Sequence, residues 1–379
     1  MPPKLLRKIF IALAIPFVLF ELVCWIFMPF PVEPLRALDI SNDIPGFKQK
    51  VRVITGADQM RYLDWTAGDK PEGTVRILCI GGFATQGILQ AAEDTWWGKL
   101  HSRLKGKGLK VQTAARGFDR TGVILMATLM TRTVERLKPD VIILNSGFDD
   151  VIIHPGDYVY DKEKFSKLPI GDPPPAWKQF LLKVSQTARF MRYRTKDSET
   201  NKLQNELGRR DVYKKFFDEK RAAIQRLPRH PGFPRAGIAN DPLQEYLDGL
   251  AAFRDLAAKN NASLILTGEP TLFNRFMNIA ESELLLAYIS SNAPKEDGTV
   301  SDPRRPEPEW VISELTRYAG AAEKFAADNK LPWLDLNGQV DRSTTNFFSD
   351  VILTDAGAEA AAAVIEPVVE PVVRAKAGK

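Results

Sequence analysis

Cysteine and histidine are scarce in this chain of 379 residues, which holds two cysteines and three histidines. The two cysteines, Cys24 and Cys79, are too few for a disulfide framework or a cysteine zinc site. Three histidines leave little room for histidine-rich metal chemistry. We therefore expect neither a metal nor a cofactor. The formal net charge of +5 is too small to indicate nucleic-acid binding, so we expect no nucleic acid among the partners.

The overall composition is that of a globular protein. Hydrophobic residues make up 44% of the chain and charged residues 26%. These values exclude a disordered, collagen-like or polytopic membrane protein. The length allows two domains or one domain with large insertions, and it is sufficient to bury a core without disulfides.

A long apolar run stands near the amino terminus, over residues 9–28, with Glu21 as its single charge. About 20 helical residues cross the roughly 30 Å hydrocarbon core of a membrane. Three basic residues precede the run: Lys4, Arg7 and Lys8. Because basic residues flank the cytoplasmic side of a span, we expect a signal anchor over residues 1–31 with a cytoplasmic amino terminus.

Two other interpretations of this run fit less well. A cleavable signal peptide needs small residues at its cleavage site, and none follow the apolar core. A lipoprotein signal needs a small residue before its cysteine, whereas Val23 precedes Cys24. Glu21 lies close to the middle of the expected span, where an ionisable group is costly. It predicts either a protonated side chain in a single span or a contact with a partner helix.

Short apolar runs alternate with helical segments from Thr74 onward. Strands are predicted at 75–80, 109–115, 140–145, 263–267 and 332–336, and helices at 96–104, 123–137, 243–259, 309–329 and 355–374. This pattern predicts an α/β fold, a three-layer α/β/α sandwich around a five-stranded parallel sheet. Ligands bind outside the carboxyl ends of such strands. The candidate site therefore consists of the loops after Ile80, Ala115, Asn145 and Thr267 together with the segment before the last helix.

Two insertions interrupt the alternation, at about residues 151–240 and 272–308, and residues 32–73 are expected to be a linker. Residues 178–235 contain sixteen Lys and Arg against six Asp and Glu. This basic stretch is either a solvated helical insertion or a face that docks on anionic headgroups or an anionic polymer. Aromatic residues, including Phe216 and Phe217, are interleaved with its charges, which suits an interfacial helix as well as a core. The second insertion is a candidate lid.

Four sequence blocks at the predicted strand ends carry a family resemblance. They read ILCIGGFATQG (77–87), ARGFDRTG (115–122), KPDVIILNSGFDD (138–150) and FFSDVILTDAG (347–357). In order and spacing they resemble the blocks of membrane-anchored bacterial SGNH/GDSL hydrolases over about residues 74–375. No single block is specific, but four in order are.

The resemblance implies a serine nucleophile, a histidine base, an aspartate that orients it, and an oxyanion hole. The nucleophile position is Phe83, the base position is Ile352, and the aspartate position is Ser349. Gly117 keeps the oxyanion glycine, whereas Asp149 replaces the oxyanion asparagine and would repel a developing oxyanion. The triad positions are thus occupied by residues unable to perform the family's reaction.

Several nearby residues are candidates for the binding cleft: Gly82, Thr85, Arg116, Arg120, Asp150 and Asp350. A shift of one residue would make Asp350 the triad aspartate, and Thr85 is a displaced hydroxyl. The histidines lie elsewhere, at positions 101, 154 and 230. The carboxylates of Asp149, Asp150 and Asp350 could converge on a cation. The alternative is that Asp149 or Asp150 caps the following segment or pairs with Arg116 or Arg120. A dinucleotide loop is excluded because the spacing G-x-G-x-x-G is absent.

Two functional hypotheses follow. The first is a single-pass protein of the bacterial inner membrane with a periplasmic, catalytically inactive SGNH-like domain that acts as a binding or scaffolding subunit. Its expected partners are membrane lipid, a membrane protein at Glu21, and anionic polymer or headgroups at the basic insertion. The alternative is an esterase or O-acyltransferase that acts on cell-envelope polysaccharide with non-standard catalytic residues.

Overall fold

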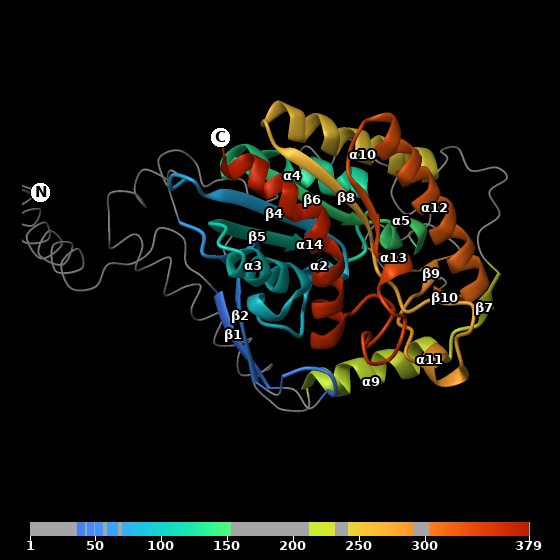
Figure 1. Cartoon of the computed structure of the whole chain (residues 1–379). Helices are drawn as coiled ribbons and strands as arrows, with labels where there is room; N and C mark the ends of the chain where they lie inside the picture. Colours follow the sequence, from blue (N-terminus) through green and yellow to red (C-terminus); the bar gives the residue numbers. More distant parts are fainter. Residues whose placement is uncertain are drawn as a thin grey trace, which may run out of the picture.

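The computed structural model describes residues 36–41, 44–48, 50–55, 59–66, 70–152, 212–231, 242–290 and 303–378. Its centre is a six-stranded sheet with the strand order β11-β8-β6-β4-β5-β3 (Figure 1). Five of the strands are parallel: β4 (Val75–Gly81), β5 (Val111–Gly117), β6 (Val141–Ser146), β8 (Ser263–Gly268) and β11 (Trp333–Asp335). The predicted α/β fold with a mostly parallel central sheet is confirmed.

The sixth strand corrects the predicted count of five. Strand β3 (Arg61–Leu63) pairs antiparallel with β5 at the sheet edge. It was missed because three residues are too few to show a period of two. A separate antiparallel pair, β1 (Arg36–Ser41) with β2 (Lys50–Thr55), also falls in the segment that the sequence treats as a linker.

Helices cover both faces of the sheet. On one face α3 (Trp96–Gly106) packs against α14 (Asp355–Ala377), and on the other α4 (Val123–Leu137) and α12 (Pro308–Asp328) pack against α10 (Pro242–Lys259) (Figure 1). The right-handed crossovers of parallel strands require this alternation, because β5 and β6 lie on opposite sides of β4. Charged pairs join α3 to α14, including Arg103 with Glu366 at 2.8 Å.

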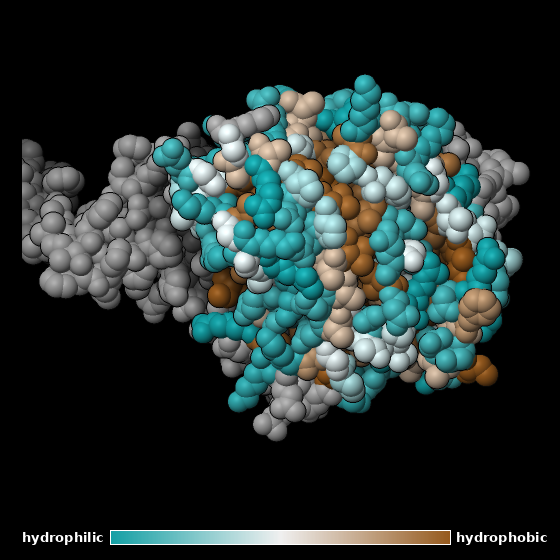
Figure 2. All heavy atoms as spheres, viewed as in Figure 1, coloured by the Kyte–Doolittle hydropathy of each residue, from teal (hydrophilic) through white to brown (hydrophobic). Residues whose placement is uncertain are grey.

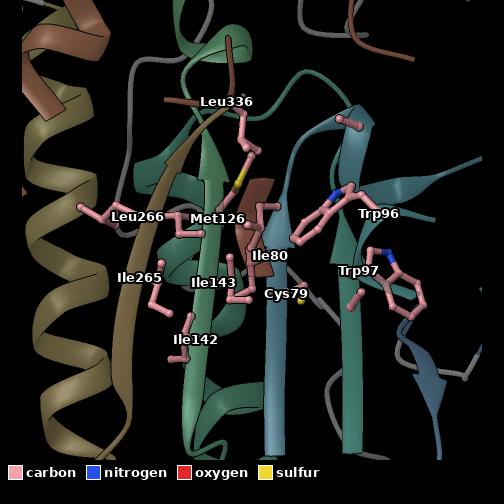
Figure 3. Packing of buried hydrophobic residues seen from close by; sticks show 14 of the residues in the cluster. Cys79, Ile80, Trp96, Trp97, Met126, Ile142, Ile143, Ile265, Leu266 and Leu336 are labelled. Atoms are coloured by element: carbon pink, nitrogen blue, oxygen red, sulfur yellow. The ribbon is translucent and has the colours of Figure 1, made fainter. Parts of the chain in front are cut away.

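Because both faces are covered, the central strands are apolar throughout. Every residue of β4 and β6 is buried. Figure 3 shows side chains of neighbouring strands packed together, among them Ile80, Ile143 and Ile265. Trp97, at the start of α3, donates from Nε1 to the carbonyl of Thr85 at 3.1 Å. This bond fastens the loop after β4 to the core.

Shorter elements complete the described part of the chain. They are α2 (Phe83–Gln86), a 3₁₀ turn (Ala92–Asp94), α5 (Phe148–Ile152), α9 (Val212–Gln225), β7 (Arg229–His230), α11 (Ile279–Glu283), β9 (Ile289–Ser290), β10 (Pro303–Pro306) and α13 (Leu336–Gln339). The strands β7, β10 and β9 form a small second sheet. Helices α9 and α11 lie side by side at the lower edge in Figure 1, and Gln225 of α9 donates to the carbonyls of Ser282 and Glu283, each at 3.2 Å.

The expected membrane anchor lies outside the described residues, together with Glu21 and Cys24. His154 and much of the basic insertion lie outside them as well. None of the helices in the described ranges combines the length and the apolar character that a membrane crossing requires.

Candidate functional site

The turn after β4 holds the residue at the expected nucleophile position. Phe83 begins the one-turn helix α2, and its half-buried ring packs against two hydrophobic clusters. Thr85, the displaced hydroxyl, is 1% exposed. A Cβ on Gly81 would lie 2.4 Å from Thr85 Oγ1, so this hydroxyl faces back onto the end of β4. The turn therefore presents a phenyl ring, and its hydroxyl is enclosed.

The loop before α14 holds the positions expected for the base and its aspartate. Ser349, Asp350 and Ile352 are all buried. The loop is tight, since the amide of Phe348 donates to the carbonyl of Ile352 at 2.8 Å. It ends where Thr354 caps α14 by accepting from the amide of Gly357 at 3.1 Å.

Asp350 holds a neighbouring segment in place. Its two carboxylate oxygens accept from the amide of Leu286 at 2.9 and 3.0 Å. Burial raises the pKa of Asp350 to about 7, against the opposing effects of this amide and of the nearby cations. The carboxyl therefore binds the second insertion to the last loop, and no imidazole of the described residues contacts it.

An apolar cluster joins the positions that the resemblance assigns to nucleophile and base. We name it the Phe217 cluster; its buried members are Ile44, Leu89, Phe217, Ile224, Leu286 and Ile352, and the half-buried side chains around them include Phe47, Phe83, Tyr288 and Phe348. The ring of Phe217 meets that of Phe348 edge-on at 5.1 Å between centroids. Such edge-to-face pairs add to the stability gained by burial. Helix α9, part of the basic insertion, thus packs onto the strand-end loops.

Arg221 secures α9 over this cluster. Its guanidinium donates to the carbonyl of Phe348 at 2.7 Å and lies 4.2 Å from the centre of the Phe348 ring. Burial lowers the pKa of Arg221, although the carboxylates of Asp218 and Asp350 oppose this effect. Arg221 of the basic insertion is therefore packed against the domain. The interpretation of this stretch as a solvated insertion does not predict such a contact.

Two buried carboxyl groups meet beside the turn after β4. A Cβ on Gly82 would lie 2.7 Å from Oε1 of Glu269 and 3.0 Å from Oδ2 of Asp149, so both groups border one point. Burial raises the pKa of both carboxyls. The charge of Asp150 raises the pKa of Asp149 further, and the charges of Asp149 and Asp150 raise that of Glu269 further. The amide of Ala84 donates to Glu269 at 3.4 Å. In the place of the expected oxyanion asparagine, these two carboxyls therefore hold their protons to higher pH than free carboxyls do.

Glu269 was missed by the sequence reasoning. It follows β8 directly, at one of the four strand ends expected to face the site. An acidic residue at the carboxyl end of an apolar core strand was the available signal. It was overlooked because it belongs to none of the four family blocks.

Asp150, Arg116 and Arg120 make contacts other than the aspartate–arginine pairs that the sequence suggested. Asp150 Oδ1 accepts from the amide of Val123 at 2.9 Å, at the start of α4, and burial raises its pKa to about 7. Arg120 donates to the carbonyl of Tyr288 at 3.0 Å, and Arg116 lies 4.7 Å from the ring centre of Phe118. Asp149 accepts weakly from the amide of Thr121 at 3.4 Å.

The structure brings several predicted residues to one edge of the sheet. Gly117 touches α2, since a Cβ there would lie 2.2 Å from the amide nitrogen of Gln86. Gly82 touches Asp149, and Phe83 shares its cluster with Ile352. No group of three His, Cys, Asp or Glu side chains in the described part of the chain is arranged as a metal site.

A hydroxyl, an imidazole and a carboxylate do meet in one place, away from this edge. Nδ1 of His101 lies 2.9 Å from Thr113 Oγ1, and Nε2 lies 3.3 Å from Asp64 Oδ2. Thr113 is buried in the middle of β5, about 13 Å along the strand from Gly117 at about 3.3 Å per residue. Burial lowers the pKa of His101. This network joins α3 to β5, and its His101 and Thr113 are buried while Asp64 is exposed. His230 lies in β7.

Comparisons with known proteins complete the description of the site. No protein-family model matches the chain, and no curated protein matches it. Among solved structures it is similar to the acetyl xylan esterase AlAXEase, with 13% identity, a TM-score of 0.40, and coverage of 78% of this chain and 100% of that one.

Two further solved structures cover 79% of this chain and 99% of their own. A carbohydrate acetylesterase family member from Sinorhizobium meliloti has 11% identity and a TM-score of 0.42. The inhibitor-bound aryl esterase of M. smegmatis has 12% identity and a TM-score of 0.40. These similarities concern the fold and carry no statement about chemistry. The described domain is an α/β fold with a mostly parallel sheet, and the four motif blocks lie at the carboxyl ends of its parallel strands or before its last helix.

Proposed function

We propose that this chain is a catalytically inactive member of the SGNH-like proteins, anchored in the bacterial inner membrane with its domain in the periplasm. It acts as a binding or scaffolding subunit of a membrane or cell-envelope assembly. The observation that carries the proposal is the Phe217 cluster. Its apolar side chains fill the space between Phe83 and Ile352, where the family's chemistry needs a nucleophile and a proton acceptor.

Neither residue is able to perform those steps. A phenyl ring does not attack an acyl carbon, and a butyl side chain does not accept a proton. Asp149, at the oxyanion position, is a buried carboxyl whose pKa is raised to about 8, so its proton is not fixed there as the amide hydrogens of an asparagine are. Removal of the triad from serine hydrolases leaves roughly 10³- to 10⁴-fold catalysis from the oxyanion hole and binding, and this remainder also requires the oxyanion donors.

The test is an assay of the purified full-length chain with acyl esters, such as p-nitrophenyl acetate and acetylated polysaccharide. We expect rates equal to those of the heat-denatured protein. Turnover that survives purification and disappears in Asp149→Ala or Thr85→Ala would overturn the proposal. The matched control is Glu72→Ala, an exposed carboxylate in the turn before β4.

One observation favours the alternative of an esterase or O-acyltransferase. The carboxyl groups of Asp149 and Glu269 border one point and titrate above their ordinary range, as general acids and bases of active sites do. This alternative predicts a pH-dependent rate that falls by at least about 100-fold in Glu269→Gln, because general acid–base catalysis contributes that much or more. Companions recovered in stoichiometric amounts with the detergent-solubilised chain support the subunit hypothesis, whereas recovery of the chain alone supports the enzyme.

A further inference from the structure

Exposed apolar side chains gather at one edge of the molecule. The large apolar residues exposed in the described part of the chain are Ile54, Phe216, Phe276 and Ile279. Three of the four lie on α9 or on residues 275–283, which lead into and form α11. We name these two segments together the α9–α11 edge. In Figure 2 apolar atoms protrude at the lower right, where Figure 1 places α11.

The tip of this edge is held in a fixed shape while its apolar side chains stay in solvent. Phe276 is 94% exposed and Ile279 is 79% exposed. The amide of Phe276 donates to Asn274 Oδ1 at 2.8 Å. Asn278 and Glu281 form a reciprocal capping box at the start of α11, with both bonds at 2.9 Å. The backbone is therefore ordered by local hydrogen bonds, and the exposed side chains take no part in that order.

The charge beside the tip is positive. On the α9–α11 edge, residues 212–231 contain six Lys and Arg against two acidic residues, Asp218 and Glu219, and residues 275–283 contain Arg275 against Glu281 and Glu283, so the balance is positive. Lys214 pairs with Asp218 at 2.8 Å, and Lys215 lies 3.9 Å from Glu219. Lys220 and Arg226 have no acidic side chain within salt-bridge distance among the described residues. Lys220 instead lies 5.9 Å from the centre of the exposed Phe216 ring.

We propose that the α9–α11 edge docks on a bilayer that contains anionic lipid. Phe276 and Ile279 enter the boundary between headgroups and acyl chains, and the cations of α9 lie on the headgroups. Basic side chains beside exposed aromatic and aliphatic ones are the pattern of interfacial segments. A bilayer suits this tip better than a polysaccharide does. Electrostatic binding of an anionic polymer does not bury an aliphatic side chain, whereas a bilayer buries the exposed Ile279. A side chain 94% exposed, as Phe276 is, lines no groove of the kind that binds a peptide. This inference rests on the proposed membrane location.

The test reads lipid contact at the tip of the full-length chain. Cys24 is replaced by serine and Ile279 by cysteine, which is labelled with an environment-sensitive fluorophore; Cys79 stays unlabelled because it is fully buried. The chain is placed in nanodiscs of phosphatidylcholine alone or with phosphatidylglycerol, with and without doxyl-labelled acyl chains. The matched control carries the label at exposed residue 72, in the turn before β4.

We expect acyl-chain quenching of about half the signal at residue 279 in anionic discs, and about a tenth or less at residue 72. Phe276→Ser and the pair Lys220→Glu and Arg226→Glu should each weaken this quenching severalfold, the charge pair only in anionic discs. Equal quenching at residues 279 and 72 overturns the proposal. So does a blue shift at residue 279 that requires a soluble anionic polysaccharide, or one that appears with a second copy of the chain in detergent.

The outcome is separable from that of the proposed anchor. Failure of the chain to enter nanodiscs counts against the anchor. The same labelled chain is then mixed with preformed anionic vesicles, where quenching at residue 279 still supports docking and its absence refutes it. The esterase assay is independent of both results, because the substituted residues Phe276, Ile279, Lys220 and Arg226 are not members of the Phe217 cluster.

Discussion

Replacement of Phe217 by alanine should detach α9 from the loops at the carboxyl edge of the sheet. The ring is 1% exposed, and it packs edge-on against Phe348 within the Phe217 cluster. Truncation of a buried phenylalanine costs about 3–5 kcal/mol in a cavity that does not collapse. Because α9 lies at the edge of the molecule, we expect this loss of stability to lower the free energy of local opening of α9 and residues 347–353. An opening free energy lower by about 3 kcal/mol speeds amide exchange there by about 100-fold.

Hydrogen–deuterium exchange with mass spectrometry measures this effect, and urea unfolding reports whether the whole domain is affected. The neighbouring residue supplies a matched control, because Phe216 is 51% exposed on the same helix. Phe216→Ala should change stability by no more than about 0.5 kcal/mol. Equal exchange rates in the two variants would mean that the buried ring of Phe217 does not hold α9 against the loops at the carboxyl edge of the sheet. The proposed role of the Phe217 cluster would then be wrong.

Three further predictions concern the residues around the site. Burial raises the pKa of Asp350 to about 7, above its unfolded value of about 4, so the folded chain holds the extra proton and the free energy of unfolding falls as pH rises between these values. Asp350→Asn should remove up to about 1.4 kcal/mol per pH unit of that slope in urea unfolding, and an unchanged slope would contradict the assignment. Arg61 donates to the carbonyls of Gln86, Gly87 and Gln90, so Arg61→Met should cost about 3 kcal/mol in thermal unfolding; a loss below about 0.5 kcal/mol would show that these bonds are dispensable. Gly82→Ala places a Cβ 2.7 Å from Glu269 and should lower the melting temperature, and Glu269→Ala in the same chain should restore part of the loss.

Much of the fold could be predicted from local patterns. The apolar runs of β4 and β6 are buried on both faces, so their composition alone indicates core strands of a parallel sheet. The Ala-rich segment that forms α14 begins at Thr354, whose hydroxyl caps it as helix-start preferences predict. Three of the motif blocks also lie at the strand ends that the resemblance implies, and the fourth precedes α14.

The rest depends on contacts between distant segments. Nothing local distinguishes Phe216 from Phe217, yet one ring lies in solvent and the other closes the cluster, because only tertiary packing decides which face of α9 is covered. Strand β3 exists through its pairing with β5. The pairing of Glu269 with Asp149 needs two strand ends that are 120 residues apart in the sequence to meet at Gly82.

The absence of a working nucleophile is tested most directly with a reagent that reports activated hydroxyl groups. The full-length chain is incubated with a fluorophosphonate, and its intact mass is measured beside that of an active GDSL esterase. We expect an adduct on the esterase and an unchanged mass for this chain. A single stoichiometric adduct on a serine or threonine at the carboxyl edge of the sheet, lost on heat denaturation, would contradict the account.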